Sequence, residues 1–279
     1  MVIGSTGQIG SELTRKLRSI YGNANVVAGY IKGAEPTGEL AEAGPMAECD
    51  VTNQQMIADV VKKYNIDTIY NLAALLSVVA ESKPRLAWKI GIDGLWNILE
   101  VAREHGCAVF TPSSIGSFGL NTPKMLTPQD TIQRPRTIYG VSKVTTELLS
   151  DYYHNKYGVD TRAVRFPGVI SYVTPPGGGT TDYAVDIMEA DPARLVHRNA
   201  FNIASLSFAP ETVFAAIKKY KPEFEMTYDV DPLKQSIAES WPDRMDDTCA
   251  REEWDWCPAY DLDAMTKDML EKLTIKLKG

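Results

Sequence analysis

The sequence contains little cysteine and little histidine, and neither residue occurs in a pattern that would give it a chemical role. The cysteines are Cys49, Cys107, Cys249 and Cys257, and the histidines are His105, His154 and His197. The cysteines form no C-x-x-C pair and lack the density of a disulfide scaffold, so we expect reduced thiols in an intracellular protein, cytoplasmic or from the mitochondrial matrix. Because the histidines lack metal-ligand spacing, the sequence predicts no metal site.

The chain also lacks clusters of basic residues and long apolar runs. Its net charge is −7 at pH 7, and without a basic surface we expect no nucleic-acid partner. No apolar run approaches the roughly 20 residues that cross a bilayer, and Met1 leads directly into a glycine turn rather than a signal peptide. We therefore expect no membrane partner. A hydrophobic content of 44% over 279 residues is typical of a globular protein with a large core.

Glycine is concentrated near the start, in the run Gly4-x-x-Gly7-x-x-Gly10. Glycines at this spacing permit a tight turn and a close approach of the backbone to a pyrophosphate at a helix N-terminus. An apolar helical stripe and a buried strand over 26–31 follow, which predicts a βαβ unit. Only three residues precede Gly4, fewer than a first strand usually has. The alternative is a plain turn between a strand and a helix.

The residues at the ends of the next two strands are candidates to contact the adenosine half of a dinucleotide. A dinucleotide fold usually has an acidic residue at the end of its second strand, but here that end is followed by Lys32. Lys32 is either a contact for a 2′-phosphate or a solvated loop lysine. A third strand ends at Asp50 and Val51, and Asp50 is either a contact for adenine or a cap for a helix over 53–64.

The most informative stretch is Tyr139-x-x-x-Lys143, which is expected at the start of a helix. Residues four apart lie one above the other on a helix, so the Lys143 ammonium can lie beneath the Tyr139 phenol and stabilise its phenolate. Such a phenolate can remove a proton from an alcohol. The alternative is an exposed helix face with an unrelated lysine. Ser113 and Ser114 leave a strand over 108–114 and offer hydroxyls to a substrate oxygen or to a local turn.

The rest of the chain shows further helix and strand patterns. Strands are expected at 66–74, 158–166 and 224–230, and helices at 88–105, 209–220, 247–254 and 261–277, with Gly106 ending the first of these helices. The predicted fold class is α/β. We expect a Rossmann-type doubly wound parallel sheet over 1–170, and a smaller C-terminal α+β lobe over 171–279 that mainly binds substrate.

Six elements in order resemble the extended short-chain dehydrogenase/reductase family. They are the glycine run, Asp50-Val51, Asn71-Leu72-Ala73-Ala74, Ser113-Ser114, Tyr139-x-x-x-Lys143 and Arg165-Phe166-Pro167-Gly168. Six motifs in the correct order are far more specific than any one of them. Within the family, the runs 71–77, 112–119, 176–185 and 241–243 are most similar to the L-threonine 3-dehydrogenases.

This resemblance implies an NAD-dependent enzyme that oxidises L-threonine at C3 to 2-amino-3-oxobutanoate, and a homodimer. It implies Tyr139 as the general base, Lys143 as its partner and Ser114 as the residue that binds the reacting hydroxyl. The implied cofactor contacts are Gly4, Gly7, Gln8, Ile9, Gly10, Asp50, Val51, Leu72, Ala73, Ala74, Tyr139, Lys143 and Pro167. The implied substrate contacts are Ser77, Ser113, Ser114, Tyr139, Thr180 and Trp241.

Two other functions are compatible with these residues, and one departure from the family is visible. The same fold and Tyr/Lys pair serve nucleotide-sugar 4-epimerases and dehydratases, and a dinucleotide sensor without catalysis is a further alternative. In the family, a strand and loops usually follow the helix after Thr180, whereas here Met188 runs directly into Glu189 and the next loop. Either this chain is a shortened member of the family, or a segment has been omitted between residues 188 and 189. We expect an omission, because a deletion would remove part of the pocket wall.

Overall fold

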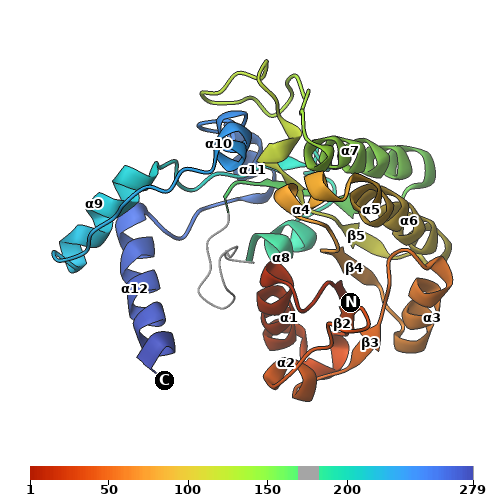
Figure 1. Cartoon of the computed structure of the whole chain (residues 1–279). Helices are drawn as coiled ribbons and strands as arrows, with labels where there is room; N and C mark the ends of the chain where they lie inside the picture. The colour runs from red at the N-terminus through yellow and green to blue at the C-terminus, as the bar shows by residue number, and fades with distance from the viewer. Residues whose placement is uncertain (169–181, 279) are drawn as a thin grey trace.

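The computed structural model describes residues 1–168 and 182–278. Figure 1 shows an α/β body with an arm formed by α9 and α12. The strands are β1 (Val2–Ile3), β2 (Ala28–Tyr30), β3 (Met46–Glu48), β4 (Thr68–Asn71), β5 (Ala108–Phe110), β6 (Ser113–Ser114), β7 (Thr161–Arg162), β8 (Val164–Phe166) and β9 (Phe201–Asn202). The α-helices are α1 (Gln8–Tyr21), α2 (Glu39–Glu42), α3 (Gln54–Tyr64), α4 (Ser77–Ser82), α5 (Pro84–Trp88), α6 (Gly94–His105), α7 (Ile138–Tyr157), α8 (Asp182–Glu189), α9 (Pro210–Tyr220), α10 (Pro232–Glu239), α11 (Thr248–Trp254) and α12 (Leu262–Lys278).

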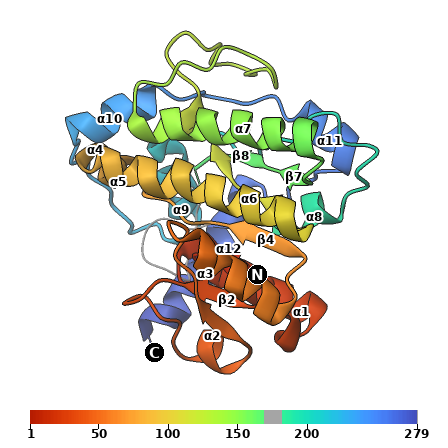
Figure 2. The same ribbon diagram turned by 90° about the vertical axis from the view of Figure 1, so that its right-hand side faces the viewer.

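Six parallel strands form the main sheet in the order β3-β2-β1-β4-β5-β7. This order places the exits of β1 and β4 side by side at the point where the winding reverses, which is where open α/β sheets bind ligands. Helices α1, α2 and α8 cover one face, and α3, α6 and α7 cover the other (Figures 1 and 2). The predicted Rossmann-type fold is therefore confirmed.

The core lies on both faces of this sheet because successive strand residues point in opposite directions. Val2 packs with Leu13 of α1 and Phe110, whereas its neighbour Ile3 packs with residues of α3 and α6. The buried cluster that contains Val2 also contains Phe201 and Trp254, so side chains from both sides of the predicted boundary at residue 170 share one core. The boundary itself stays a prediction.

A second, smaller sheet carries the strands that leave the main sheet. It has the order β6-β8-β9, with Ser113 opposite Arg165 and Arg165 opposite Asn202. The single strand that we expected over 158–166 is thus divided. Its first part, β7, pairs with β5 in the main sheet, and its second part, β8, pairs with β6 and β9.

Most of the predicted helices are present, with small differences at their ends. The helix expected over 88–105 is divided into α5, a π-helical turn over Lys89–Asp93 and α6, and Gly106 ends α6 with a φ of 72°. The strand expected over 224–230 is wrong, because this stretch has no ladder partner among the described residues. Its side chains pack back on α9 instead: Phe224 stacks on Phe214, and Tyr228 donates to Glu211.

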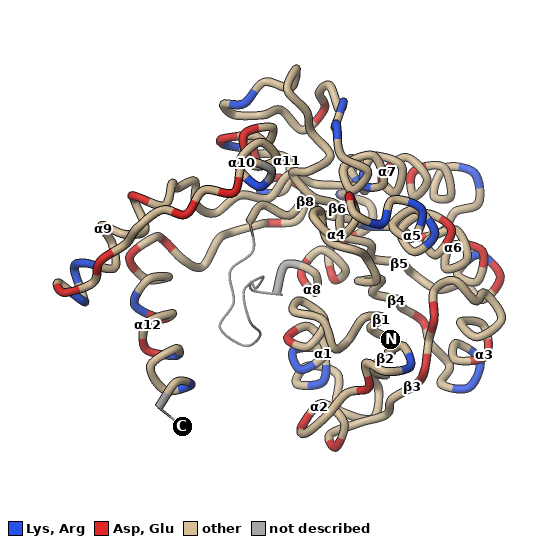
Figure 3. Tube along the Cα trace, in the orientation of Figure 1, with Lys and Arg blue, Asp and Glu red and all other residues tan. Residues whose placement is uncertain are grey.

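Charged residues of both signs are scattered over the molecule. Figure 3 shows no continuous basic stripe along the part of the chain that is described, in keeping with the net charge of −7. Within that part, no helix is both long and apolar enough to span a membrane.

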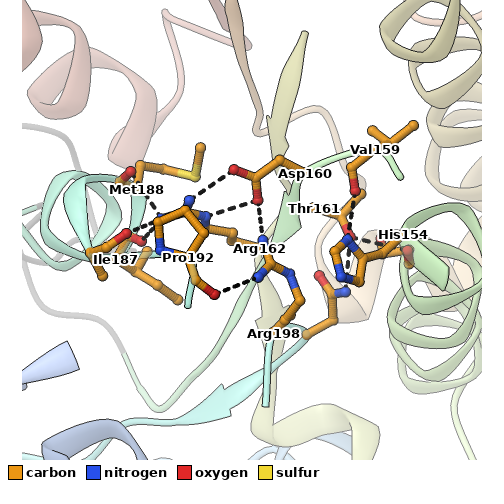
Figure 4. A network of polar contacts seen from close by, with 12 residues as sticks. His154, Val159, Asp160, Thr161, Arg162, Ile187, Met188, Pro192 and Arg198 are labelled. Atoms are coloured by element: carbon orange, nitrogen blue, oxygen red, sulfur yellow. Dashed lines mark hydrogen bonds and ion pairs between the residues drawn. The ribbon is translucent and has the colours of Figure 1, made fainter. Parts of the chain in front are cut away.

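Arg162, on β7 of the main sheet, hydrogen-bonds the C-terminal end of α8 (Figure 4). Its Nη1 donates to the carbonyls of Ile187, Met188 and Ala190 at 2.6, 3.0 and 3.0 Å, which are groups that the end of a helix leaves without partners. Its Nη2 lies 2.8 Å from Asp160 Oδ2. Burial raises the pKa of Asp160, but hydrogen bonds and charges of the nearby arginines outweigh it, and the net pKa is lowered. Arg162 on β7 therefore hydrogen-bonds the backbone on both sides of the junction between residues 188 and 189.

We predict that Arg162→Met destabilises the protein by about 3–5 kcal/mol, because it removes one partner of a mostly buried ion pair together with the cap of α8. Arg194→Met is the matched control, since Arg194 pairs with Asp255 at the surface with 45% and 75% of the two side chains exposed. That control should cost no more than about 1 kcal/mol. Urea unfolding of both variants checks this, and equal losses would contradict the role of Arg162.

Candidate functional site

The glycine loop joins β1 to α1, and its backbone segments approach one another closely. Gly4 has a φ of 79°, and a Cβ on Gly10 would lie 2.1 Å from the Gly4 carbonyl oxygen, so only glycine is tolerated at position 10. Gly7 precedes α1 without a side-chain cap, which leaves amides of the first turn for a ligand. The buried Nε2 of Gln8 also has no hydrogen-bond partner. Such a cradle of unpaired donors suits a pyrophosphate.

The exit of β4 lies against this loop. A Cβ on Gly4 would lie 3.2 Å from the Leu72 carbonyl carbon, and the Leu72 amide donates to the Ile3 carbonyl. The small residues Ala73 and Ala74 continue from here along a narrow cavity of about 30 Å³ that reaches Pro112 and Lys143. The predicted cofactor contacts on β1 and β4 are thus adjacent, and they lead toward the Tyr/Lys helix.

The adenosine end carries less specific chemistry. Lys32 follows β2 and is exposed. Asp50 accepts hydrogen bonds from the amide and hydroxyl of Thr52 at 2.8 and 2.9 Å, whereas the side chain of Asn53 caps α3 by accepting from the Met56 amide. The alternative in which Asp50 caps this helix is therefore wrong. Asp50 instead shapes the turn after β3, next to buried Val51.

Tyr139 and Lys143 occupy the first turns of α7. Thr137 caps the helix by accepting from the Gly140 amide at 3.0 Å. The Lys143 Nζ lies 5.5 Å from the centroid of the Tyr139 ring and donates to the Pro112 carbonyl at 2.7 Å. The lysine is only 7% exposed, so the charge that faces the phenol ring lies out of bulk water. The spacing in the sequence and the observed geometry agree.

Ser114 reaches the same place from the other side. Its Oγ accepts from the Gly116 amide at 3.1 Å. A Cβ on Gly116 would lie 3.1 Å from Tyr139 Cε1 and 3.4 Å from the Ser114 Oγ, so the hydroxyl and the phenol ring flank this glycine. Tyr139, Lys143 and Ser114 therefore meet at one place, and of the three Lys143 lines the narrow cavity at the end of β4.

Ser113 lies elsewhere, and it reveals a residue that reasoning from the sequence missed. Its buried hydroxyl donates to the Glu147 carboxylate rather than facing Tyr139. Glu147 also pairs with Arg165 at 2.8 Å, and both side chains are almost fully buried. The signal was present in the sequence, because Glu147 follows Lys143 by the same interval of four that separates Lys143 from Tyr139.

The remaining candidate residues lie on separate elements around this centre. Ser77 begins α4, whose Glu81 Oε1 accepts from the Ile138 amide at 2.6 Å and so joins α4 to the start of α7. Trp241 follows α10. Pro167 directly follows β8. Thr180 lies outside the described residues.

Comparisons with known proteins agree with this geometry. A model of the NAD dependent epimerase/dehydratase family matches residues 1–190. An uncharacterized epimerase/dehydratase of Staphylococcus saprophyticus is 48% identical over 314 residues of alignment, which cover 100% of this chain and 98% of the relative. Since this chain has 279 residues, the relative carries residues that have no counterpart here. The expected omission after Met188 stays a prediction.

Solved structures give the same picture. An L-threonine dehydrogenase from Clostridium difficile is 51% identical with a TM-score of 0.93, covering 100% of this chain and 98% of that one. A GalE-like L-threonine dehydrogenase from Cupriavidus necator, in its holo form, is 39% identical with a TM-score of 0.91, covering 98% of each chain. A UDP-glucose 4-epimerase from Thermotoga maritima, at 20% identity and a TM-score of 0.80 over 99% of this chain and 98% of that one, shares the fold alone.

The match of the family model to more than half of the chain, the curated relative at 48% identity and the glycine cradle lead to one conclusion. The chain belongs to the NAD-dependent epimerase/dehydratase family, within the extended short-chain dehydrogenases/reductases, and its cofactor is NAD.

Proposed function

We propose that the protein oxidises L-threonine at C3 to 2-amino-3-oxobutanoate, a step of threonine catabolism. The observation that carries this proposal is the convergence of Tyr139, Lys143 and Ser114 beside the cavity at the end of β4. Support for the substrate comes from the solved L-threonine dehydrogenases, which are 51% and 39% identical over nearly the whole chain.

The residues of the site divide the work between binding and proton transfer. The glycine loop with Gln8 and Ile9, Asp50 and Val51 after β3, residues 72–74 after β4, and Pro167 after β8 would hold NAD. When bound, NAD supplies the acceptor for the hydride that leaves C3. Ser114 holds the threonine hydroxyl, Tyr139 removes its proton as general base, and the Lys143 ammonium stabilises the phenolate.

Substrate selection requires polar contacts, because threonine is small and offers few apolar groups. In the proposed site, Ser77 and Trp241 line the pocket from α4 and from the segment after α10, and Thr180 contributes from the stretch beyond Pro167. Ser113 acts through Glu147, to which its hydroxyl donates. A site built to hydrogen-bond a substrate group rejects analogues that lack that group far more strongly than an apolar slot rejects a missing methylene.

We predict that Tyr139→Phe lowers turnover by at least about a hundredfold, the usual scale of general acid–base catalysis, and leaves NAD affinity nearly unchanged. Turnover and cofactor affinity are measured on the same preparation. Tyr228→Phe is the matched control, because that exposed tyrosine donates only to Glu211 on α9 among the described residues and should behave as the parent. Near-normal turnover of Tyr139→Phe would remove this residue from the mechanism.

Substrate identity has its own prediction. L-threonine should reduce NAD in an absorbance assay, and L-serine, which lacks the methyl group, should show kcat/KM at least about tenfold lower. 2-Aminobutyrate lacks the hydroxyl and should not react.

A UDP-sugar is added in parallel. If it is epimerised or dehydrated and threonine is inert, the epimerase or dehydratase function replaces the dehydrogenase. If neither compound reacts but NAD binds, the protein is a dinucleotide sensor.

We further propose that the protein is a homodimer. Helices α5, α6 and α7 expose apolar side chains on one surface of the molecule, at Leu86, Trp88, Trp96, Val141, Leu148 and Tyr152. Figure 2 shows α6 and α7 side by side along this surface. A surface of this kind suits a second copy, because a two-fold axis brings the same apolar patch of both chains together.

Leu148 is 61% exposed, and we predict that Leu148→Glu yields a monomer, because a dimer would bury the new carboxylate without a partner. Sedimentation or light scattering measures the mass. Leu277→Glu on α12 is the matched control and should keep the mass of the parent. A parent protein that is already monomeric at micromolar concentration would exclude the dimer.

A further inference from the structure

Three side chains with metal-binding atoms converge far from the glycine loop. They are His197, in the segment before β9, and Cys249 and Glu253, which lie one turn apart on α11. One nitrogen, one sulfur and one carboxylate oxygen of these residues lie within 4.8 Å of one another. The sequence could not indicate this cluster, because the histidine is distant from the helix along the chain and only the fold brings them together.

The His197 ring lies between two carboxylates, one at each ring nitrogen. Its Nδ1 lies 2.5 Å from Glu253 Oε1, and its Nε2 lies 3.5 Å from Asp130 Oδ2. Metal-bound histidines usually use one ring nitrogen for the metal and donate the other N–H to a carboxylate, which fixes the tautomer. Here Nδ1 is hydrogen-bonded to Glu253 Oε1, a contact that a shared metal ion would replace, and the Asp130 carboxylate lies on the opposite edge of the ring at an ion-pair distance.

Glu253 is oriented in the same manner. Its second oxygen, Oε2, accepts from the amides of Val196 and His197 at 2.5 and 2.9 Å. The carboxylate is therefore fixed by backbone groups on one side, and its Oε1 is directed at the cluster. The three ligand atoms already lie within 4.8 Å of one another, and a Zn²⁺ ion with ligands at about 2.0–2.3 Å would enter between them as the hydrogen bond from Nδ1 to Oε1 opens.

The electrostatics of the cluster favour a cation. The Glu253 and Asp130 carboxylates lie 2.5 and 3.5 Å from the two nitrogens of the His197 ring, so negative charge already surrounds this space. A thiolate would add one further negative charge to these carboxylates. A divalent cation would offset that charge, and the thiol proton would pass to solvent as the metal–sulfur bond forms.

We propose that His197, Cys249 and Glu253 form a zinc site, with Asp130 orienting the histidine. A thiolate and an imidazole favour Zn²⁺ over Mg²⁺ or Ca²⁺, which prefer oxygen ligands. With three protein ligands, the proposed ion would complete its tetrahedral shell with a water molecule. The ion joins α11 to the segment before β9 and lies beside the contact between Phe201 and Trp254 in the core. This proposal overrides the expectation from the sequence that no metal binds, and it is independent of the substrate.

The test uses Co²⁺ as a spectroscopic probe on the full chain after treatment with a chelator. Cobalt bound by a thiolate gives an intense near-ultraviolet charge-transfer band, so one equivalent of Co²⁺ should produce this band and Zn²⁺ should abolish it. Zn²⁺ should also raise the melting temperature of the chelated protein, because it binds only the folded state. A titration that produces no such band overturns the proposal.

Variants assign the ligands. Cys249→Ser should lose the cobalt band, and the matched control Cys257→Ser, at an exposed cysteine, should keep it. Asp130→Asn keeps all three ligands but should weaken Zn²⁺ binding by about tenfold or more, as expected for loss of a carboxylate that orients a ligand. Asp130 is exposed, so this variant is expected to fold even if Cys249→Ser does not. A band that survives in Cys249→Ser, or an unchanged Zn²⁺ affinity in Asp130→Asn, overturns the assignment.

Discussion

The buried ion pair between Glu147 and Arg165 holds the candidate active site together. Both Arg165 Nε and Nη2 donate to the Glu147 carboxylate, at 3.0 and 2.8 Å. Glu147 also accepts from Ser113 and Gln133, and Arg165 donates further to the Gln129 carbonyl and Asn202. Charges removed from water are costly unless every polar group finds a partner. The pair therefore imposes a single relative position on α7, β6, β8 and β9.

This constraint positions the catalytic candidates because they share elements with it. Tyr139, Lys143 and Glu147 follow one another at intervals of four along α7, so anchoring Glu147 also sets the rotation of the helix about its axis. Ser114 is the neighbour of Ser113 on β6, and successive strand residues point to opposite faces. When Ser113 turns inward to Glu147, Ser114 turns outward to the space beside Tyr139.

The cofactor side of the site depends on the backbone, whereas the substrate side depends on side chains from several separate segments. Gly4, Gly10 and the exit of β4 approach one another so closely that a Cβ on Gly10 would overlap the Gly4 carbonyl. In the enzyme that we propose, substrate choice would depend instead on the start of α4 and the segment after α10. Those segments can change without altering the sheet.

Local features of the chain were predictable from the sequence, because they depend on contacts within one turn or one helix. The glycine loop, the αL end of α6 at Gly106 and the stacking of Lys143 under Tyr139 belong to this class. Alternating apolar residues over 224–230 misled the prediction, because Phe224 packs on α9 and not on a neighbouring strand.

Other features were decided by the tertiary structure alone. The 158–166 strand is divided between two sheets, and His197 meets α11, because residues distant along the chain come together in the fold. Ser113 contacts Glu147 because of the face of the strand on which it lies. The sequence by itself predicted the glycine loop, the pairing of Tyr139 with Lys143 and most of the helices, because each of these depends on spacing within one element or turn. Spacing along a chain fixes direction only within a single element, so the partners of a buried side chain are set by how the elements pack.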